Sequence, residues 1–414
     1  MRLGLLLLFF LFSYNCFSQK KITLKEAEQL LQKNNLQLVA EKYNISASQA
    51  AVIQAKIWNQ PDLTLDINAF NPGRNQFFDI GDKGEKFVSI EQLIYLGGKK
   101  KHEINFAKSN LAIAQLEFEQ LLRNLKYQLH QTFYSVYFDN QKIQSLNTQI
   151  SIIDTLVNNY NAEANLENVP LREVVRLQSL VLNLKNEKNY LQNNIIEATQ
   201  NLSLLTGIYE NLEPVVNEAE ILLKYQTALF SKDLILATAL ESNIEYLTTI
   251  KFSESQESYL KWQKSLAVPD ITTGISYDQL AGAFLNQINV NMTISLPFWN
   301  KNKGNIKLAE AQLSQSNIKK DYKKMELKTK VEIYWQQYQQ QLNQLNNIDK
   351  STIINLELVY QGMIFNFKKR NITMLEFTDF MDSYNQSLIQ INDIKKSLVL
   401  SVLNLNYITN KEIF

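Results

Sequence analysis

Residues 288–296 read Ile-Asn-Val-Asn-Met-Thr-Ile-Ser-Leu, a strict alternation of apolar and polar side chains. Successive side chains of a β-strand point to opposite faces, so this stretch predicts a strand with one apolar and one polar face. Its length is typical of a tilted strand that crosses a membrane. Alternation of this kind also fits a half-buried strand of a soluble sheet, and the pattern alone does not separate the two.

Three further segments predict strands of the same kind, although they alternate less cleanly: 63–69, 88–94 and 271–277. Aromatic residues stand near the strand ends, namely Trp58, Tyr95, Phe298 and Trp299. Membrane barrels carry rings of aromatic side chains at both membrane interfaces. The aromatic residues therefore favour membrane strands over a soluble sheet.

The segment 1–18 is expected to be a secretory signal peptide. Arg2 precedes an unbroken apolar run, 3–12, and the small residues Cys16 and Ser18 place the cleavage after Ser18. Because Cys16 is the only cysteine, a mature chain would have neither disulfides nor thiolate metal sites. A lipoprotein signal with acylated Cys16 is the alternative.

The rest of the chain has no run of 18 apolar residues, so no transmembrane helix is expected after the signal. A membrane-spanning form would then have to be a β-barrel. Lys and Arg number 42 and Asp and Glu 41, for a net charge of +1, which argues against nucleic acid as a partner. No catalytic or phosphate-binding motif occurs, so neither an enzyme nor a cofactor is expected.

Two stretches predict very long helices because they contain neither glycine nor proline: from Gly98 to Pro170, and from Gly304 to Gly362. At 1.5 Å per residue, a helix of about 65 residues is roughly 100 Å long. Apolar residues recur at steps of three and four in the first stretch, which indicates a helical bundle or coiled coil. These residues are Leu111, Ala114, Phe118, Leu121, Leu125, Leu129, Phe133 and Val136.

The chain also contains an internal duplication. Pro61-Asp62 matches Pro269-Asp270, and Asn168-Val169 matches Asn371-Ile372. The predicted division is a signal peptide at 1–18, a first repeat at 19–207, a linker at 208–230 and a second repeat at 231–414. Each repeat is expected to run helix, strand, loop, strand, long helix, turn, helix. Four strands cannot close a membrane barrel, so several chains must contribute to one.

Four segments make the mature chain resemble the TolC family of outer-membrane efflux channels. They are Ile22-Thr-Leu-Lys-Glu-Ala-Glu-Gln-Leu-Leu31, Lys56-Ile-Trp-Asn-Gln-Pro-Asp-Leu63, Gln92-Leu-Ile-Tyr-Leu-Gly-Gly-Lys99 and Leu296-Pro-Phe-Trp-Asn-Lys-Asn-Lys-Gly-Asn305. Their order, together with the two matched turns, carries the resemblance.

The resemblance implies a mainly α fold with membrane β-structure. Long helical hairpins would form a periplasmic α-barrel, and three protomers would each give four strands to a 12-stranded outer-membrane β-barrel. It also implies a homotrimeric exit duct of a tripartite efflux pump in the outer membrane of a Gram-negative bacterium. The implied partners are a periplasmic adaptor protein, an inner-membrane RND-type pump and outer-membrane lipid.

The segment Pro297–Ile306 is similar to that of the family subset that works with heavy-metal cation pumps. The chain has only two histidines, His102 and His130, and neither is expected to bind metal, because such sites need several converging ligands. The alternatives are the exit duct of a type I secretion system and a periplasmic coiled-coil interaction protein.

The turns of the two hairpins are the expected functional sites. By resemblance, Glu376 and Asp379 occupy the positions of the acidic pore constriction, and Asp382 adds a third carboxylate. Rings of carboxylates in a narrow pore attract cations. Arg172 and Arg176 are candidates to pair with them and hold the pore shut. The residues expected to contact the adaptor are Asn168, Val169, Pro170, Asn371, Ile372 and Thr373.

Overall fold

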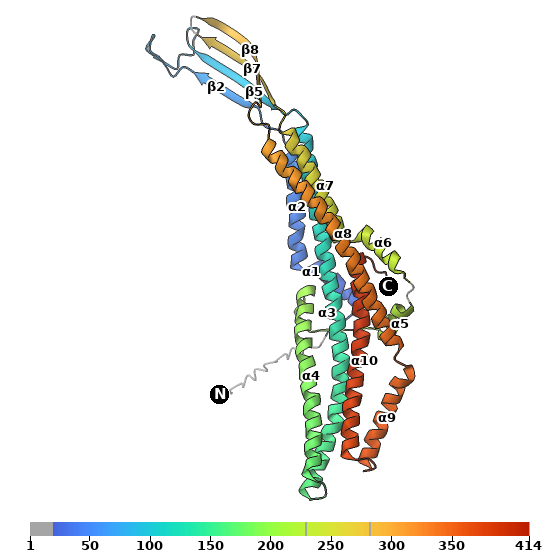
Figure 1. The fold of residues 1–414 in the computed structure, drawn as a ribbon. Coiled ribbons are helices and arrows are strands. Elements are labelled where there is room, and N and C mark those ends of the chain that lie inside the picture. The colour runs from blue at the N-terminus through green and yellow to red at the C-terminus, as the bar shows by residue number, and fades with distance from the viewer. Residues whose placement is uncertain (1–19, 228–229, 281–282, 414) are drawn as a thin grey trace, which may run out of the picture. The chain divides into compact units, whose positions relative to one another are not determined.

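The structure is a computed structural model that describes residues 20–227, 230–280 and 283–413 (Figure 1). The predicted signal peptide and Cys16 lie outside these residues. The chain divides into two compact units. Unit 1 comprises residues 1–39, 121–239 and 330–414, and unit 2 comprises residues 40–120 and 240–329. Each unit takes segments from both halves of the sequence. The division into two sequence repeats stays a prediction.

A four-stranded antiparallel sheet forms one part of unit 2, with the strand order β2-β5-β7-β8. The bounds are β2 Asp62–Ile67, β5 Lys86–Ile94, β7 Ile271–Leu280 and β8 Phe284–Ile294. All four strands predicted from the alternation are thus present, with ends shifted by a few residues. The loop between β2 and β5 adds a short hairpin of β3 Phe70–Asn71 and β4 Gln76–Phe77.

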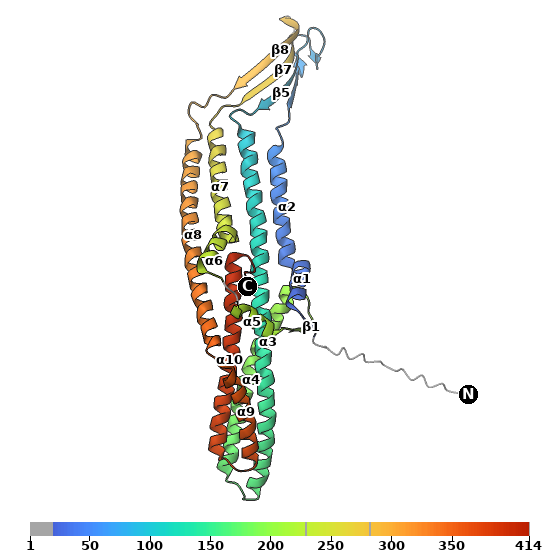
Figure 2. The same cartoon turned by 90° about the vertical axis from the view of Figure 1, so that its right-hand side faces the viewer.

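Four helices lie side by side in unit 2 in the order α2, α3, α7, α8 (Figure 2). They are α2 Leu36–Lys56, α3 Lys99–Asn165, α7 Ile244–Ser265 and α8 Lys303–Asn346, of which α2, α3 and α8 also extend into unit 1. Small polar side chains join neighbours: Ser255 Oγ donates to Asn110 Oδ1 at 2.8 Å, and Ser253 Oγ donates to Asn317 Oδ1 at 2.7 Å. Such short side chains let helix backbones approach closely.

The first predicted long helix is confirmed, because α3 is a single helix of 67 residues. Of the stripe predicted to face the core, Ala114, Leu125, Leu129, Phe133 and Val136 are buried. No helix among the described residues combines the length and the apolar character needed to cross a membrane.

The second predicted long helix is wrong, because the chain breaks between α8, which ends at Asn346, and α9 Lys350–Lys368. Asp349 caps α9: its Oδ1 accepts a hydrogen bond from the backbone N of Ser351 at 3.0 Å, and its Oδ2 accepts one from the Ser351 hydroxyl at 2.6 Å. Asn and Asp side chains compete with the helix for backbone hydrogen bonds. The segment Asn346-Asn347-Ile348-Asp349 therefore interrupts the helix without glycine or proline.

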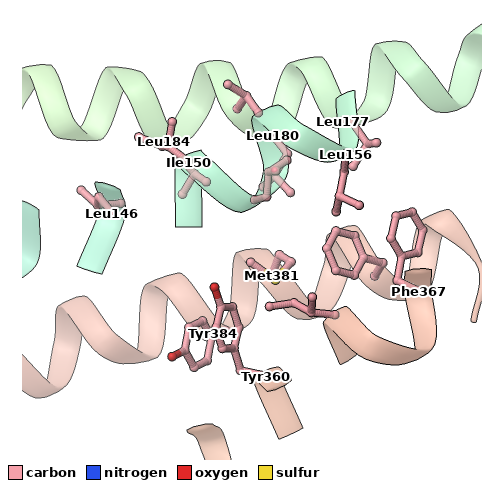
Figure 3. Close-up of a cluster of buried hydrophobic side chains, with 14 of the residues drawn as sticks. Leu146, Ile150, Leu156, Leu177, Leu180, Leu184, Tyr360, Phe367, Met381 and Tyr384 are labelled. Atoms are coloured by element: carbon pink, nitrogen blue, oxygen red, sulfur yellow. The ribbon is translucent and has the colours of Figure 1, made fainter. Parts of the chain in front are cut away.

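Unit 1 contains a bundle of the second half of α3 with α4 Leu171–Thr206, α9 and α10 Met374–Thr409. Side chains from all four helices form one buried cluster, which includes Ile153, Leu177, Phe367 and Phe377 (Figure 3). The rings of Phe367 and Phe377 stack with centroids 4.1 Å apart. This cluster lies on the helix segments that flank the two hairpin turns, and it therefore holds the turns in place.

The remaining elements of unit 1 are α1 Leu24–Asn34, α5 Glu218–Thr227, α6 Lys232–Ser242 and a parallel pair of β1 Lys20–Ile22 with β6 Leu212–Pro214. A capping box starts α1. The backbone N of Thr23 donates to Glu26 Oε2 at 2.8 Å, and Thr23 Oγ1 accepts from the backbone N of Glu26 at 3.4 Å.

Candidate functional site

The two hairpin turns of unit 1 are built alike. Glu167 and Arg370 both adopt a left-handed backbone conformation, each with φ of 60°. In the first turn the backbone N of Asn168 donates to the carbonyl of Glu163 at 3.0 Å, and in the second the backbone N of Asn371 donates to the carbonyl of Asn366 at 2.9 Å. The same interval of 203 residues separates every matched pair. The match found in the sequence at the turns is therefore also a match of backbone structure.

An ion pair connects the two turns. A guanidinium nitrogen of Arg370, Nη2, lies 3.3 Å from Glu163 Oε2, and the same oxygen accepts a hydrogen bond from Asn168 Nδ2 at 3.1 Å. Glu163 and Arg370 could not be paired from the sequence, because they are 207 residues apart. The duplication could have drawn attention to Arg370, because it aligns this residue with Glu167 of the first turn.

The predicted gate residue Glu376 forms the capping box of α10. Its Oε2 accepts hydrogen bonds from the backbone N of Thr373 at 2.8 Å and from the Thr373 hydroxyl at 2.9 Å, while the backbone N of Glu376 donates to that hydroxyl at 3.2 Å. The hydrogen bond from the Thr373 backbone is the main cause that holds the pKa of the Glu376 carboxyl below its usual value. Glu376 is thus a negatively charged group held at a fixed position next to the turn.

Asp379 and Asp382 follow on the same helix, three residues apart, and both are exposed. Partial burial, with a smaller contribution from the negative charge of Asp379, raises the pKa of the Asp382 carboxyl. The three predicted gate carboxylates therefore stand along one side of α10. The surroundings therefore make Asp382 easier to protonate than an ordinary aspartate.

Arg172 and Arg176 lie on the first two turns of α4, and both side chains are exposed. Within the part of the chain that the structure describes, neither forms an ion pair with Glu376, Asp379 or Asp382. The structure thus does not bring the two groups together inside one protomer. The predicted pairing stays a prediction.

The predicted adaptor-contact residues divide into two groups. Asn168, Pro170, Asn371 and Thr373 are exposed, whereas Val169 and Ile372 are half-buried. Ile372 packs against the buried cluster behind the turn. The exposed apolar side chains at the first turn are instead Leu166 and Leu171, which are 68% and 69% exposed. The apolar surface at this turn therefore comes from the residues that flank the predicted ones.

The sheet of unit 2 has one apolar and one polar face. Leu63, Ile90, Ile275 and Val290 occupy one row across all four strands, and Leu65, Val88, Tyr277 and Ile288 occupy a second. Most of these side chains are exposed, with Ile288 and Val290 at 75% and 79%. The intervening row, Thr64, Ser89, Ser276 and Asn289, is polar and points to the opposite face. An exposed apolar face of this extent is what membrane strands present to lipid.

His130 lies in a charged cluster with Glu28 and Lys126. His130 Nε2 lies 2.5 Å from Glu28 Oε1, and Lys126 Nζ lies 3.2 Å from the other oxygen of the same carboxylate. The bond to His130 is the main cause that lowers the pKa of the Glu28 carboxyl. In the described ranges 20–227, 230–280 and 283–413, no group of three or more His, Cys, Asp or Glu side chains converges on a position for a metal ion.

No protein-family model matches the chain. A curated relative, the cobalt-zinc-cadmium resistance protein CzcC of Cupriavidus metallidurans, is 21% identical over 300 residues, which are 71% of this chain and 68% of CzcC.

Solved structures of outer-membrane channels share the fold. CusC matches with a TM-score of 0.74 and 14% identity, over 93% of this chain and 91% of that one. The CmeC outer-membrane channel of Campylobacter jejuni matches with a TM-score of 0.72 and 12% identity, over 94% and 86%. The open state of the MtrE channel of Neisseria gonorrhoeae matches with a TM-score of 0.64 and 12% identity, over 94% and 89%. The fold implied by the TolC-family resemblance is thus confirmed.

Proposed function

We propose that this chain, which has the fold of TolC-family outer-membrane channels, is the outer-membrane exit duct of a tripartite efflux pump. It would act as a homotrimer and conduct its cargo passively, so that the energy comes from an inner-membrane RND-type pump through a periplasmic adaptor. The proposal assigns no chemical step to the chain itself.

The exposed apolar face of the sheet is the observation that carries the proposal. Leaving large apolar side chains such as Ile288 and Val290 in water is unfavourable, at about 25 cal/mol per Å² of apolar surface. Contact with lipid removes this cost. Among the described residues, β2 and β8 pair on one side only, so each offers a free edge. Pairing of β8 with β2 of the next protomer would satisfy both edges and close a 12-stranded barrel.

The same sheet weighs against the alternative of a periplasmic coiled-coil interaction protein. A soluble sheet would turn its apolar rows toward a core, whereas here these rows are exposed. The exit duct of a type I secretion system remains the second candidate among channels, because it would need the same barrel and the same helices.

Divalent metal cations are the proposed cargo. CzcC, which aligns with 71% of the chain, is named for cobalt, zinc and cadmium resistance. The carboxylates of Glu376, Asp379 and Asp382 near the second turn would favour cations at the pore entrance. Coordination by the protein is not required, since a water-filled duct can pass hydrated ions.

The test combines fractionation, conductance and metal tolerance. The chain should be found in the outer-membrane fraction as a heat-sensitive trimer, and the purified trimer should form cation-selective channels in planar bilayers. Deletion of its gene should lower the tolerated concentrations of Co²⁺, Zn²⁺ and Cd²⁺ by several fold. A chain that appears only in the soluble periplasmic fraction would refute the channel, whereas normal metal tolerance with loss of peptide or protein export would favour the type I duct.

A further inference from the structure

A groove in unit 2 runs across three neighbouring helices, α3, α7 and α8. It encloses about 280 Å³ and is lined by Phe106, Phe252, Gln256, Tyr259, Gln312 and Gln315. Three of the lining side chains are aromatic and three are carboxamides. The lining contains no charged group, although Lys, Arg, Asp and Glu make up 20% of the chain.

Aromatic rings that contact one another form one side of the groove. The centroids of the Phe106 and Tyr259 rings lie 5.1 Å apart. Trp262, which is not among the lining residues, stacks on Phe106 with centroids 5.7 Å apart and an angle of 24° between the ring planes. Contacts of this kind hold the rings in defined orientations, so that their free faces form a preformed apolar platform.

The polar side of the groove consists of the carboxamides of Gln256, Gln312 and Gln315. Within the described part of the chain, these three amides have no side-chain hydrogen bond to protein. Each carboxamide offers two donors and an acceptor. A ligand in the groove would therefore find both kinds of hydrogen-bonding group beside the aromatic platform.

Four charged residues of α7 lie away from the groove and form two ion pairs within the helix. Lys251 Nζ is 2.7 Å from Glu254 Oε2, and Lys261 Nζ is 2.7 Å from Glu257 Oε1. At 3.6 residues per turn, these positions are roughly opposite Phe252, Gln256 and Tyr259. The lining itself carries no charge, so the groove is complementary to an uncharged ligand.

We propose that this groove binds an N-acetylated hexosamine unit of the cell-wall glycan. A sugar ring has an apolar face of C–H groups, which fits the aromatic platform, and its hydroxyl and acetamido groups can both donate to and accept from the three carboxamides. Such binding would attach the proposed duct to the cell wall. It goes beyond the exit-duct function, and it does not depend on conduction.

The experiment uses the full-length protein in detergent and a tetramer of N-acetylglucosamine as the probe. Isothermal titration calorimetry should show saturable binding, and the fluorescence of Trp262 should change with the same dependence on concentration. Tyr259→Ala and Gln256→Ala should each weaken binding at least tenfold. The matched controls Tyr322→Ala and Gln49→Ala, at exposed helix positions outside the groove, should leave it unchanged.

A further variant and a second ligand make the test more specific. Trp262→Phe should remove the fluorescence change but keep the calorimetric binding, because Trp262 contacts Phe106 but is not among the lining residues. Cellotetraose, which lacks the acetamido groups, should bind at least tenfold more weakly. The proposal is overturned if the tetramer does not bind at millimolar concentration, if the groove variants bind as well as the controls, or if cellotetraose binds equally. Channel conductance of the groove variants should stay normal, which separates this site from the duct itself.

Discussion

The ammonium group of Lys99 lies 2.7 Å from Oδ2 of Asp270, and Oδ1 of the same carboxylate accepts a hydrogen bond from the backbone N of Leu96 at 3.1 Å. Lys99 is the first residue of α3, and Asp270 directly precedes β7. A single carboxylate thus joins the point where β5 passes into α3 to the point where α7 passes into β7. The side chain of Lys99 is only 8% exposed, so this pair is shielded from water.

We expect Asp270→Ala to lower the free energy of unfolding by about 3 kcal/mol, because it leaves the buried ammonium of Lys99 without its partner. Chemical denaturation of the detergent-solubilised protein, followed by circular dichroism, measures the change. The control is Lys264→Ala, which removes a half-exposed pair with Glu310 and should cost less than about 1 kcal/mol. Equal effects of the two substitutions would show that the Lys99–Asp270 pair has no special structural role.

Glycine-to-alanine substitutions should have opposite effects at two positions. Gly207 ends α4 with φ of 69°, and a Cβ added there would lie 2.7 Å from the Cβ of Asn34. Gly207→Ala should therefore destabilise the protein by more than about 1 kcal/mol. Gly362 lies within α9 with nothing within 4 Å of an added Cβ. Gly362→Ala should stabilise the protein by about 0.5–1 kcal/mol. The same denaturation measurement tests both signs.

Local periodicity explains what could be predicted from the sequence. The four strands follow from alternation, and α3 follows from the stripe through Leu125, Leu129 and Phe133, because both patterns are set by residues close together in the chain. The break before α9 was missed, since Asp349 acts through a side-chain cap and not through glycine or proline. The capping box of α10 could have been predicted, because Thr373 and Glu376 have the same spacing as Thr23 and Glu26.

Contacts between distant residues could not be predicted in this way. The ion pair of Glu163 with Arg370 and that of Lys99 with Asp270 join residues from different halves of the chain. Each depends on how the two halves pack, which no short segment encodes. The exposed apolar side chains at the first turn are Leu166 and Leu171, and not Val169. This could not be predicted either, because the packing of the bundle determines which side of the turn is covered.

The three carboxylates near the second turn should contribute unequally to cation selectivity. Asp379→Asn should lower the cation-to-anion permeability ratio in planar bilayers, because it removes an exposed charge and leaves the helix cap intact. Glu376→Gln should lower the ratio less than Asp379→Asn does, because the cap of α10 holds the Glu376 carboxylate. It should also weaken the start of α10. Unchanged selectivity in Asp379→Asn would remove Asp379 from the gate.

Selectivity should also depend on pH through Asp382. Burial raises the pKa of this carboxyl, so it takes up a proton at a higher pH than an ordinary aspartate as the solution is acidified. Cation selectivity should therefore begin to fall above the usual pKa of about 3.9. Asp382→Asn should remove this early part of the decrease. The control Asp154→Asn, at a half-exposed position on α3, should leave the pH profile as in the wild type.

Acid should weaken the attachment of α1 to α3 through Glu28. Hydrogen bonding to His130 lowers the pKa of the Glu28 carboxyl in the folded protein, so its stabilising contribution is present above the unfolded value of about 4.3 and is lost as the pH falls through the folded value. Glu28→Gln should flatten the dependence of the unfolding midpoint on pH below 5. Lys25→Gln on the same helix serves as the control and should keep the wild-type slope.

The ion pair between Glu163 and Arg370 should hold the two turns of one protomer together. Glu163→Lys and Arg370→Glu each place like charges at the 3.3 Å contact, so each single variant should increase the open probability of the channel in planar bilayers. The double variant Glu163→Lys/Arg370→Glu restores opposite charges in reversed order and should return the open probability toward the wild-type value. Both residues are exposed enough that global stability should change by less than about 1 kcal/mol. If the double variant opens as often as the more open single variant, the pair does not restrain the turns, and the closed state must depend on contacts between protomers.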